Sequence, residues 1–168
     1  MLSDAEIELC VQRYERERLR YEQLARLVDT HCRTVVDEVL AVRTGVSWRL
    51  KGTASLRNKI IKNRASYASV DDFFAQISDL AGVRITTYRE QDRGLVAEAL
   101  HFAPPPAGQV FVEVKDKTGF AHHYRAIHVQ AGLRDEWLNG DAAQLRGMSC
   151  EIQVCSLLAH VYNEVEHD

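Results

Sequence analysis

The sequence predicts an α+β domain in which a mixed β-sheet of about five strands is flanked by helices. A long helical N-terminal segment belongs to this prediction, because apolar residues there recur at intervals of three and four. The rest of the chain alternates short β-rich runs with helical runs, which favours helices packed on a sheet. With 168 residues, 46% of them apolar and 27% charged, the chain is long enough to bury a core.

Helices are expected where apolar residues recur with helical spacing. No Pro or Gly interrupts residues 4–43, which form either one helix or two with a break near Asp29–His31. Ser69 is a good N-cap for a later helix, and Pro104 must follow the end of another. The shorter helices are predicted over Ser55–Asn63, Val70–Ile77, Gln91–Phe102 and from about Ser156 onward.

Strands are expected where β-branched and aromatic residues alternate with polar ones. Successive side chains of a strand point to opposite faces, so Ile152 and Val154 share one face of the last strand while Glu151 and Gln153 share the other. The sheet then has an apolar face and a face rich in functional groups, although an ordinary solvated sheet gives the same pattern. The predicted strands are Gly82–Tyr88, Gln109–Lys115, Tyr124–Gln130 and Met148–Cys155.

Positive charge is concentrated in one stretch, although the formal net charge of the chain is −3. Residues 45–70 contain no acidic residue. Six cations without a counter-charge predict a local positive patch that attracts phosphates, and a solvated basic face is the plain alternative. The six are Arg49, Lys51, Arg57, Lys59, Lys62 and Arg64.

Several classes of protein are disfavoured. No apolar run approaches the roughly 20 residues of a membrane helix, and the acidic N-terminus has no hydrophobic signal core, so we expect a cytoplasmic protein. The four cysteines form no Cys-x-x-Cys pair, which favours reduced thiols that fill the core. Cys150, Cys155 and His160 fit no common zinc-binding spacing.

Carboxylates, arginines and an aromatic residue together indicate a nucleotide site. Asp79 precedes the first predicted strand and Glu151 lies in the last, and two such carboxylates can share Mg²⁺ with substrate phosphates. Arg49 and Arg84 carry planar groups that bind phosphate and stack on flat rings, and Tyr124 can stack on a base.

The order of these residues resembles the synthetase domain of the RelA/SpoT family, which makes guanosine alarmones. The resemblance implies a nucleotidyltransferase-like sheet over 44–168, with 1–43 packing on it, and transfer of the β,γ-pyrophosphate of ATP to a 3′-hydroxyl. The matching motifs run from Arg49 to the C-terminus, where relatives usually continue, so we expect a truncated domain. They are Arg49-x-Lys51-x-x-x-Ser55-x-x-x-Lys59, Asp79-x-x-Gly82-x-Arg84, Tyr124-Arg125-Ala126-Ile127-His128, Glu151-Ile152-Gln153 and Glu166-His167.

The resemblance also implies a role for each matching residue. Arg49 and Arg84 sandwich adenine. Asp79 and Glu151 bind Mg²⁺, and Glu151 helps to deprotonate the attacking hydroxyl. The implied ATP-phosphate ligands are Lys51, Ser55 and Lys59. On the acceptor side, the implied base-stacking residue is Tyr124, or Phe120 if a short insertion follows it, and the other implied contacts are Lys117, His128 and Gln153.

Departures from the family pattern leave the acceptor open. His123, Ala126 and Cys155 stand where relatives usually have Gly, Ser and Arg. We expect no hydrolase domain, because the 48 residues before Arg49 are too few to form one, and the last helix is similar to that of small, toxin-type members. The preferred acceptor is a purine nucleotide such as GDP, GTP or an adenine nucleotide. The alternatives are a toxin that pyrophosphorylates the tRNA 3′ end and an inactive nucleotide-binding sensor. An antitoxin protein or a second copy of the chain is a further expected partner.

Overall fold

A computed structural model describes residues 1–40, 42–104, 112–119 and 122–157. Its helices are α1 (Asp4–Thr34), the π-helical turn η1 (Val35–Val39), α2 (Thr53–Lys62), α3 (Val70–Gln76), α4 (Asp92–Ala99) and the short 3-10 turns η2 (Arg64–Ser66), η3 (Asp135–Trp137) and η4 (Gly140–Leu145). Its strands are β1 (Thr44–Leu50), β2 (Ala81–Thr87), β3 (Val112–Gly119), β4 (His122–Gly132) and β5 (Ser149–Ser156).

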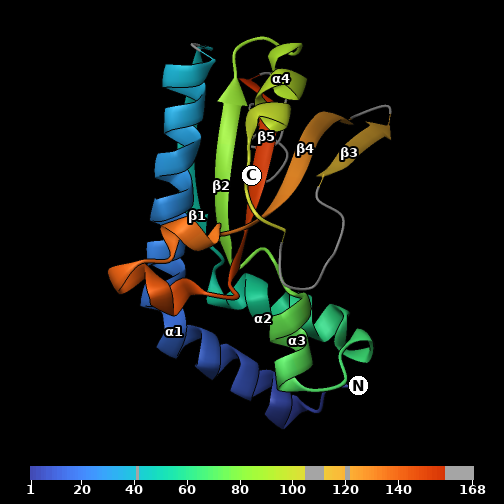
Figure 1. Cartoon of the computed structure of the whole chain (residues 1–168). Coiled ribbons are helices and arrows are strands. Elements are labelled where there is room, and N and C mark those ends of the chain that lie inside the picture. The colour runs from blue at the N-terminus through green and yellow to red at the C-terminus, as the bar shows by residue number, and fades with distance from the viewer. Residues whose placement is uncertain (41, 105–111, 120–121, 158–168) are drawn as a thin grey trace.

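The five strands form one mixed sheet in the order β1-β2-β5-β4-β3. Only the central pair, β2 and β5, is parallel among these neighbours; the other pairs are antiparallel. In Figure 1, α1 runs beside β1 and β2, and α2 and α3 lie beneath the lower end of the strands. The predicted α+β class, with its mixed sheet and long N-terminal helix, is confirmed.

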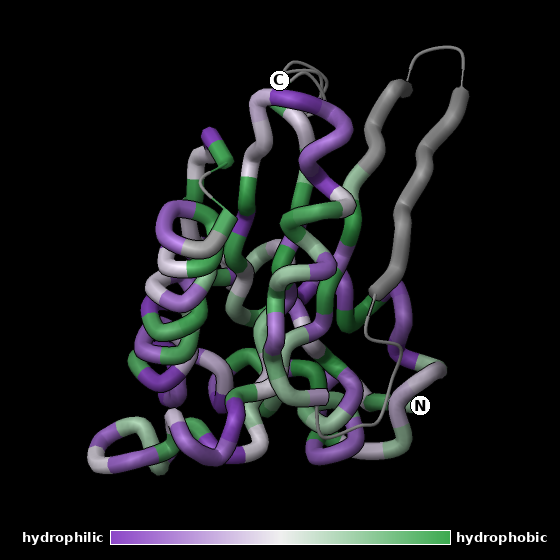
Figure 2. Tube along the Cα trace, turned by 45° about the horizontal axis from the view of Figure 1, so that its top comes forward, coloured by the Kyte–Doolittle hydropathy of each residue, from purple (hydrophilic) through white to green (hydrophobic). Residues whose placement is uncertain are grey.

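α1 is a single helix that continues through Asp29–His31. Ser3 caps it: the Ser3 side chain accepts from the backbone N–H of Glu6, and the Glu6 carboxylate accepts from the backbone N–H of Ser3. Figure 2 shows hydrophobic and hydrophilic residues interleaved along it. The apolar set faces the sheet, because side chains three and four apart share one helical face.

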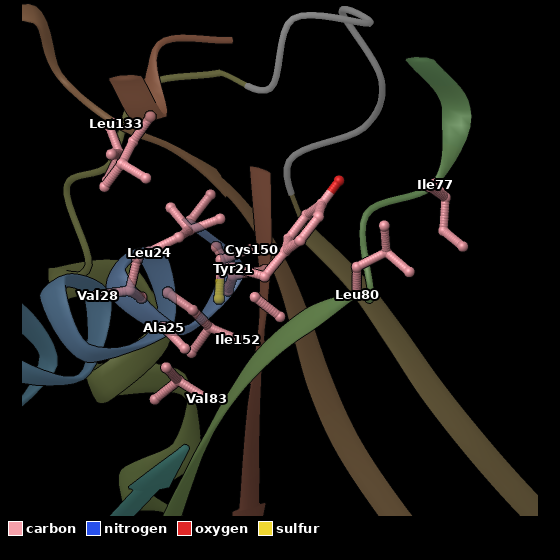
Figure 3. Close-up of a cluster of buried hydrophobic side chains, with 14 of the residues drawn as sticks. Tyr21, Leu24, Ala25, Val28, Ile77, Leu80, Val83, Leu133, Cys150 and Ile152 are labelled. Carbon is pink, nitrogen blue, oxygen red and sulfur yellow. The ribbon is translucent and has the colours of Figure 1, made fainter. Parts of the chain in front are cut away.

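The core lies between α1 and the apolar face of the sheet. In the cluster of Figure 3, Leu24 and Val28 of α1 pack near Val83 of β2 and Ile152 of β5. These side chains are at most 1% exposed. The opposite face of β2 and β5 is therefore left for polar side chains, as the alternation predicted.

Several element boundaries differ from expectation. The N-terminal helical segment stops at Val39 rather than at residue 43, and the helix that was expected to reach Phe102 ends at Ala99. The strand expected over Gln109–Lys115 spans Val112–Gly119 in the described part, and the helix expected after Ser156 lies outside the described residues beyond Leu157.

The sequence analysis missed β1. Apolar and other residues alternate along β1: Val46, Trp48 and Leu50 lie between Gly45, Ser47 and Arg49. This alternation is the signal from which the strand could have been predicted. Gly and Ser have low β-propensity, and the segment is only seven residues long, so local preference was weak. Pairing with β2 over its whole length supplies the stability that local preference lacks. No helix in the described residues is long and apolar enough to span a membrane.

Candidate functional site

A cavity of about 190 Å³ opens on the polar face of the sheet, over β1, β2, β5 and the start of α2. Most of the residues expected to bind ATP, metal or acceptor line it: Arg49, Lys51, Ser55, Asp79, Arg84, Glu151 and Gln153. Of its remaining lining residues, the sequence analysis named Gly82 as part of a motif and did not single out Leu50, Gly52 or Val83.

Strand register brings the distant motifs together. Arg49 on β1 pairs with Gly82 on β2, which pairs with Glu151 on β5. In the next row of the same face, Arg84 pairs with Gln153, which pairs with His128 on β4. The motifs lie up to about a hundred residues apart in sequence, and the parallel pairing of β2 with β5 places them on one face of the sheet.

Gly82 keeps the floor of the cavity open between Arg49 and Glu151. A Cβ atom built on Gly82 would lie 3.6 Å from the carbonyl oxygen of Glu151 and 3.9 Å from Cγ of Arg49. Both are ordinary van der Waals contacts, so a methyl group fits there. Any larger side chain would extend into the cavity itself.

Asp79 lies between two lysines at one end of the cavity. Nζ of Lys51 and Nζ of Lys59 each lie 2.8 Å from Oδ2 of Asp79. Burial by itself would raise the pKa of Asp79, but the hydrogen bonds and positive charges of the two lysines outweigh it and hold the pKa below its usual value. Asp79 is therefore ionised at neutral pH.

The second oxygen of Asp79, Oδ1, is buried and has no hydrogen-bond partner within the described residues. A carboxylate oxygen buried without a partner loses its solvation, so it calls for a bound water or a cation. Glu151, half-buried, lines the same cavity. No cluster of three or more His, Cys, Asp or Glu residues forms in the described part of the chain. Two carboxylates beside phosphate-binding groups are nevertheless sufficient for Mg²⁺, which keeps waters and substrate oxygens as its other ligands.

Glu151 contacts His128 across β4 and β5. Nδ1 of His128 hydrogen-bonds to Oε1 of Glu151, and the His128 side chain is 8% exposed. Nε2 of His128 is buried and has no partner within the described residues. The ring therefore fixes the orientation of Glu151 through Nδ1.

The arginines of the cavity differ in their contacts. Nη2 of Arg84 lies 3.5 Å from Oε1 of Gln153. The side chain of Arg49 makes no hydrogen bond or ion pair within the described residues. A guanidinium group without a protein partner is available to a planar base or to phosphate.

The basic stretch is less uniform than its sequence indicated. Arg57 donates to Glu8 at 2.6 Å, and Arg64 lies 3.0 Å from Asp4. Both acidic partners come from α1, about fifty to sixty residues away in sequence. The prediction of six uncompensated cations is therefore wrong, because tertiary folding supplies counter-charges that the local sequence lacks.

The acceptor side is only partly described. The backbones of Lys117 on β3 and Tyr124 on β4 occupy paired positions, but their side chains lie outside the described part, as does Phe120. Cys155, which replaces the expected arginine, is 1% exposed, with its sulfur 3.9 Å from Oγ1 of Thr86. His160, Glu166 and His167 also lie outside the described residues.

Comparison with known proteins gives a consistent result. Residues 48–168 match the profile of a region found in RelA and SpoT proteins, which is well over half of the chain. A search of curated proteins found no match.

Solved structures share the fold at low sequence identity. The small alarmone synthetase 1 from Bacillus subtilis is 21% identical, with a TM-score of 0.60, over 93% of this chain and 77% of that one. A GTP pyrophosphokinase family protein from Streptococcus pneumoniae is 19% identical, with a TM-score of 0.66, over 92% of this chain and 75% of that one. The small alarmone synthetase 2 from Bacillus subtilis is 20% identical, with a TM-score of 0.61, over 89% of this chain and 76% of that one.

Proposed function

Because this chain belongs to the RelA/SpoT family, we propose that its cavity transfers pyrophosphate from ATP to the 3′-hydroxyl of a purine nucleotide. The observation that carries the proposal is the convergence of Lys51, Asp79 and Glu151 at one cavity, with Lys59 paired to Asp79. Phosphoryl-type transfer depends on positioning and charge neutralisation rather than on covalent catalysis, and this set supplies both signs of charge.

The lysines are the ATP-phosphate ligands of the proposal. They share Oδ2 of Asp79, which lines the cavity and holds both ammonium groups beside it. Each ammonium has further donor capacity, so phosphate oxygens can bind without complete loss of the Asp79 contact. Ser55, in the first turn of α2, lines the same wall.

Asp79 and Glu151 are the proposed Mg²⁺ ligands. The unpartnered Oδ1 of Asp79 supports this assignment. Bound Mg²⁺ would neutralise charge on the phosphate oxygens during transfer.

Glu151 is also the proposed acceptor of the 3′-hydroxyl proton. The new bond joins the 3′-oxygen to the β-phosphorus of ATP. The bond from the β-phosphorus to the oxygen that bridges it to the α-phosphorus breaks, and AMP leaves with that oxygen and the electron pair. His128 holds the Glu151 carboxylate in place through Nδ1. Arg49 and Arg84 bind the adenine side of ATP, and Gln153 contacts the acceptor together with Tyr124 and Lys117.

A purine nucleotide is the preferred acceptor. Related structures of the small alarmone synthetase 1 from Bacillus subtilis were solved with pppGpp at 22% identity and with AMPCPP at 20% identity. A second candidate is the 3′ end of tRNA, which the replacement of an expected arginine by the buried, uncharged Cys155 favours.

A single assay separates these functions. ATP labelled at the γ-phosphate and Mg²⁺ would be supplied with GDP, GTP, ADP, AMP or bulk tRNA, and the products separated by chromatography. We expect label to move to a guanine or adenine nucleotide, with AMP as the unlabelled product. ADP as co-product would indicate a simple kinase and contradict the proposal. Label on tRNA alone would select the second candidate, and label remaining on ATP in a sample that binds ATP would indicate a sensor module.

A further inference from the structure

Gln130 lies directly opposite Glu151, the proposed acceptor of the 3′-hydroxyl proton. The antiparallel register of β4 against β5 pairs the two residues, and directly paired side chains project from the same face of a sheet. The Cβ atoms of such a pair are roughly 5 Å apart. Gln130 is half-buried, and the family resemblance assigns it no role.

One row of residues crosses four strands on the polar face of the sheet. The row is Arg49 on β1, Gly82 on β2, Glu151 on β5 and Gln130 on β4. In the proposed reaction the adenine side of ATP lies at the β1 end, and the other acceptor contacts come from β3, β4 and β5. The acceptor therefore meets Glu151 on the side of the sheet where Gln130 lies.

The side-chain amide of Gln130 is available to a ligand. It makes no hydrogen bond within the described residues. It lines a second cavity, of about 290 Å³, which adjoins the catalytic one, since Ser78 lines the second cavity and Asp79 the first. An amide both donates and accepts hydrogen bonds, so it can bind a hydroxyl group held beside Glu151.

The charges around Gln130 favour a neutral group over a phosphate. Arginines line the second cavity, but each is paired with a carboxylate, so they leave no positive excess. The pairs are Arg13 with Glu17 and Asp71, Arg20 with Glu17, and Arg146 with Asp135. The Glu151 carboxylate opposite Gln130 would also repel an anion. A hydroxyl group meets neither difficulty.

We propose that Gln130 contacts the 2′-hydroxyl of the acceptor nucleotide and thereby selects ribose over deoxyribose, which rests on the proposed function. The 2′-hydroxyl is attached to the carbon next to the one that carries the reacting 3′-hydroxyl. An acceptor whose 3′-hydroxyl reaches Glu151 therefore brings its 2′-hydroxyl within reach of the residue paired with Glu151. His128 already holds the Glu151 carboxylate, which leaves the Gln130 amide as an uncommitted polar group beside it.

The test offers GDP and 2′-deoxy-GDP, and ADP and 2′-deoxy-ADP, as acceptors of label from γ-labelled ATP. Gln130→Ala should lower kcat/KM for the ribonucleotide about tenfold, because its hydroxyl loses a partner, and should change kcat/KM for the deoxynucleotide less than about twofold. The 2′-hydroxyl also alters the reactivity of the 3′-hydroxyl, but equally in both proteins. The ratio of the two kcat/KM values therefore isolates the contact.

Gln76→Ala is the matched control. It removes the same amide from the wall of the second cavity, where Gln76 already donates to Oδ1 of Asp72 at 2.8 Å. It should leave the ratio between ribonucleotide and deoxynucleotide unchanged. Transfer to the deoxynucleotide by Gln130→Ala shows at the same time that this variant is folded.

Equal losses of kcat/KM with both sugars would give Gln130 a structural role, and unchanged kcat/KM would remove the contact; either result overturns the proposal. A changed preference between GDP and ADP, with constant discrimination between the two sugars, would assign Gln130 to the base and would also overturn it. Wild-type protein that transfers label to no nucleotide would contradict the proposed function itself, and the role of Gln130 with it.

Discussion

Nζ of Lys51 lies 2.8 Å from Oδ2 of Asp79, so a phosphate-binding lysine and a metal-binding carboxylate of the proposed reaction form one ion pair. Lys51 follows β1 and Asp79 precedes β2, and the backbone N–H of Lys51 donates to the carbonyl oxygen of Leu80 at 3.0 Å. The sheet therefore fixes both groups through the ends of two paired strands.

Replacing Asp79 by Asn should reduce pyrophosphate transfer at least a hundredfold, because it removes the charge that holds two lysines and a proposed metal ion. The fold should survive, since Asn has the same shape. Transfer would be measured with saturating ATP and Mg²⁺, and folding by circular dichroism. Asp141→Asn, at an exposed site, is the control and should retain activity. Activity of the Asp79 variant within tenfold of wild type would contradict the metal assignment.

Asp79 also links stability to pH. Its pKa in the folded state is lower than its usual 3.8, so its stabilising effect is complete above that value and is lost as pH falls through the lower folded-state pKa. Urea unfolding of wild type and Asp79→Asn would be compared from pH 7 down to pH 3. We expect a constant difference in unfolding free energy above about pH 5 and a smaller one in acid. A difference that grows below pH 4 would contradict the depressed pKa.

Tyr14 supports Lys51 from the other side of the sheet. Its ring is fully buried in α1, and its hydroxyl donates to the carbonyl oxygen of Lys51 at 2.7 Å. Tyr14→Phe should cost about 1 kcal/mol of stability by loss of that hydrogen bond and should raise KM for ATP several-fold with a smaller change in kcat. Tyr67→Phe is the control, because the hydroxyl of this buried tyrosine makes no hydrogen bond within the described residues. Equal changes in KM for the two variants would contradict the role of Tyr14 in positioning Lys51.

Substitutions at Gly82 should show a size dependence. Gly82→Ala adds only a methyl group in ordinary contact with its neighbours, so KM for ATP should change less than about threefold. Gly82→Val adds atoms that extend into the cavity, and KM should rise about tenfold or more. Steady-state kinetics and thermal unfolding of both variants would separate loss of binding from loss of fold. Equal KM values for Gly82→Ala and Gly82→Val would contradict binding of ATP in the cavity beside Gly82.

The four cysteines should be unreactive in the native protein. All are buried and free, and burial raises the pKa of Cys32 to about 12 and raises the pKa values of Cys10, Cys150 and Cys155. Since the thiolate is the reactive form, a thiol reagent at pH 8 should label none of them until the chain unfolds. Titration in denaturant should then find all four. Rapid labelling of a native thiol would contradict its burial.

The sequence by itself determined the class of fold, the long first helix, four of the five strands and most of the residues that line the catalytic cavity. These predictions rest on local periodicity and on the order of motifs, and both can be read from the sequence alone. Even so, β1 was missed, because its local preference is weak and its pairing with β2 stabilises it.

Only the tertiary structure decided which charges meet. Asp4 and Glu8 of α1 compensate Arg64 and Arg57, which the sequence left unpaired. The contact between His128 and Glu151 depends on the register of β4 against β5. Arg20 and Arg146 line one cavity although 125 residues separate them in sequence. Electrostatic energies depend on distance in space, and sequence separation carries no information about that distance until the chain has folded.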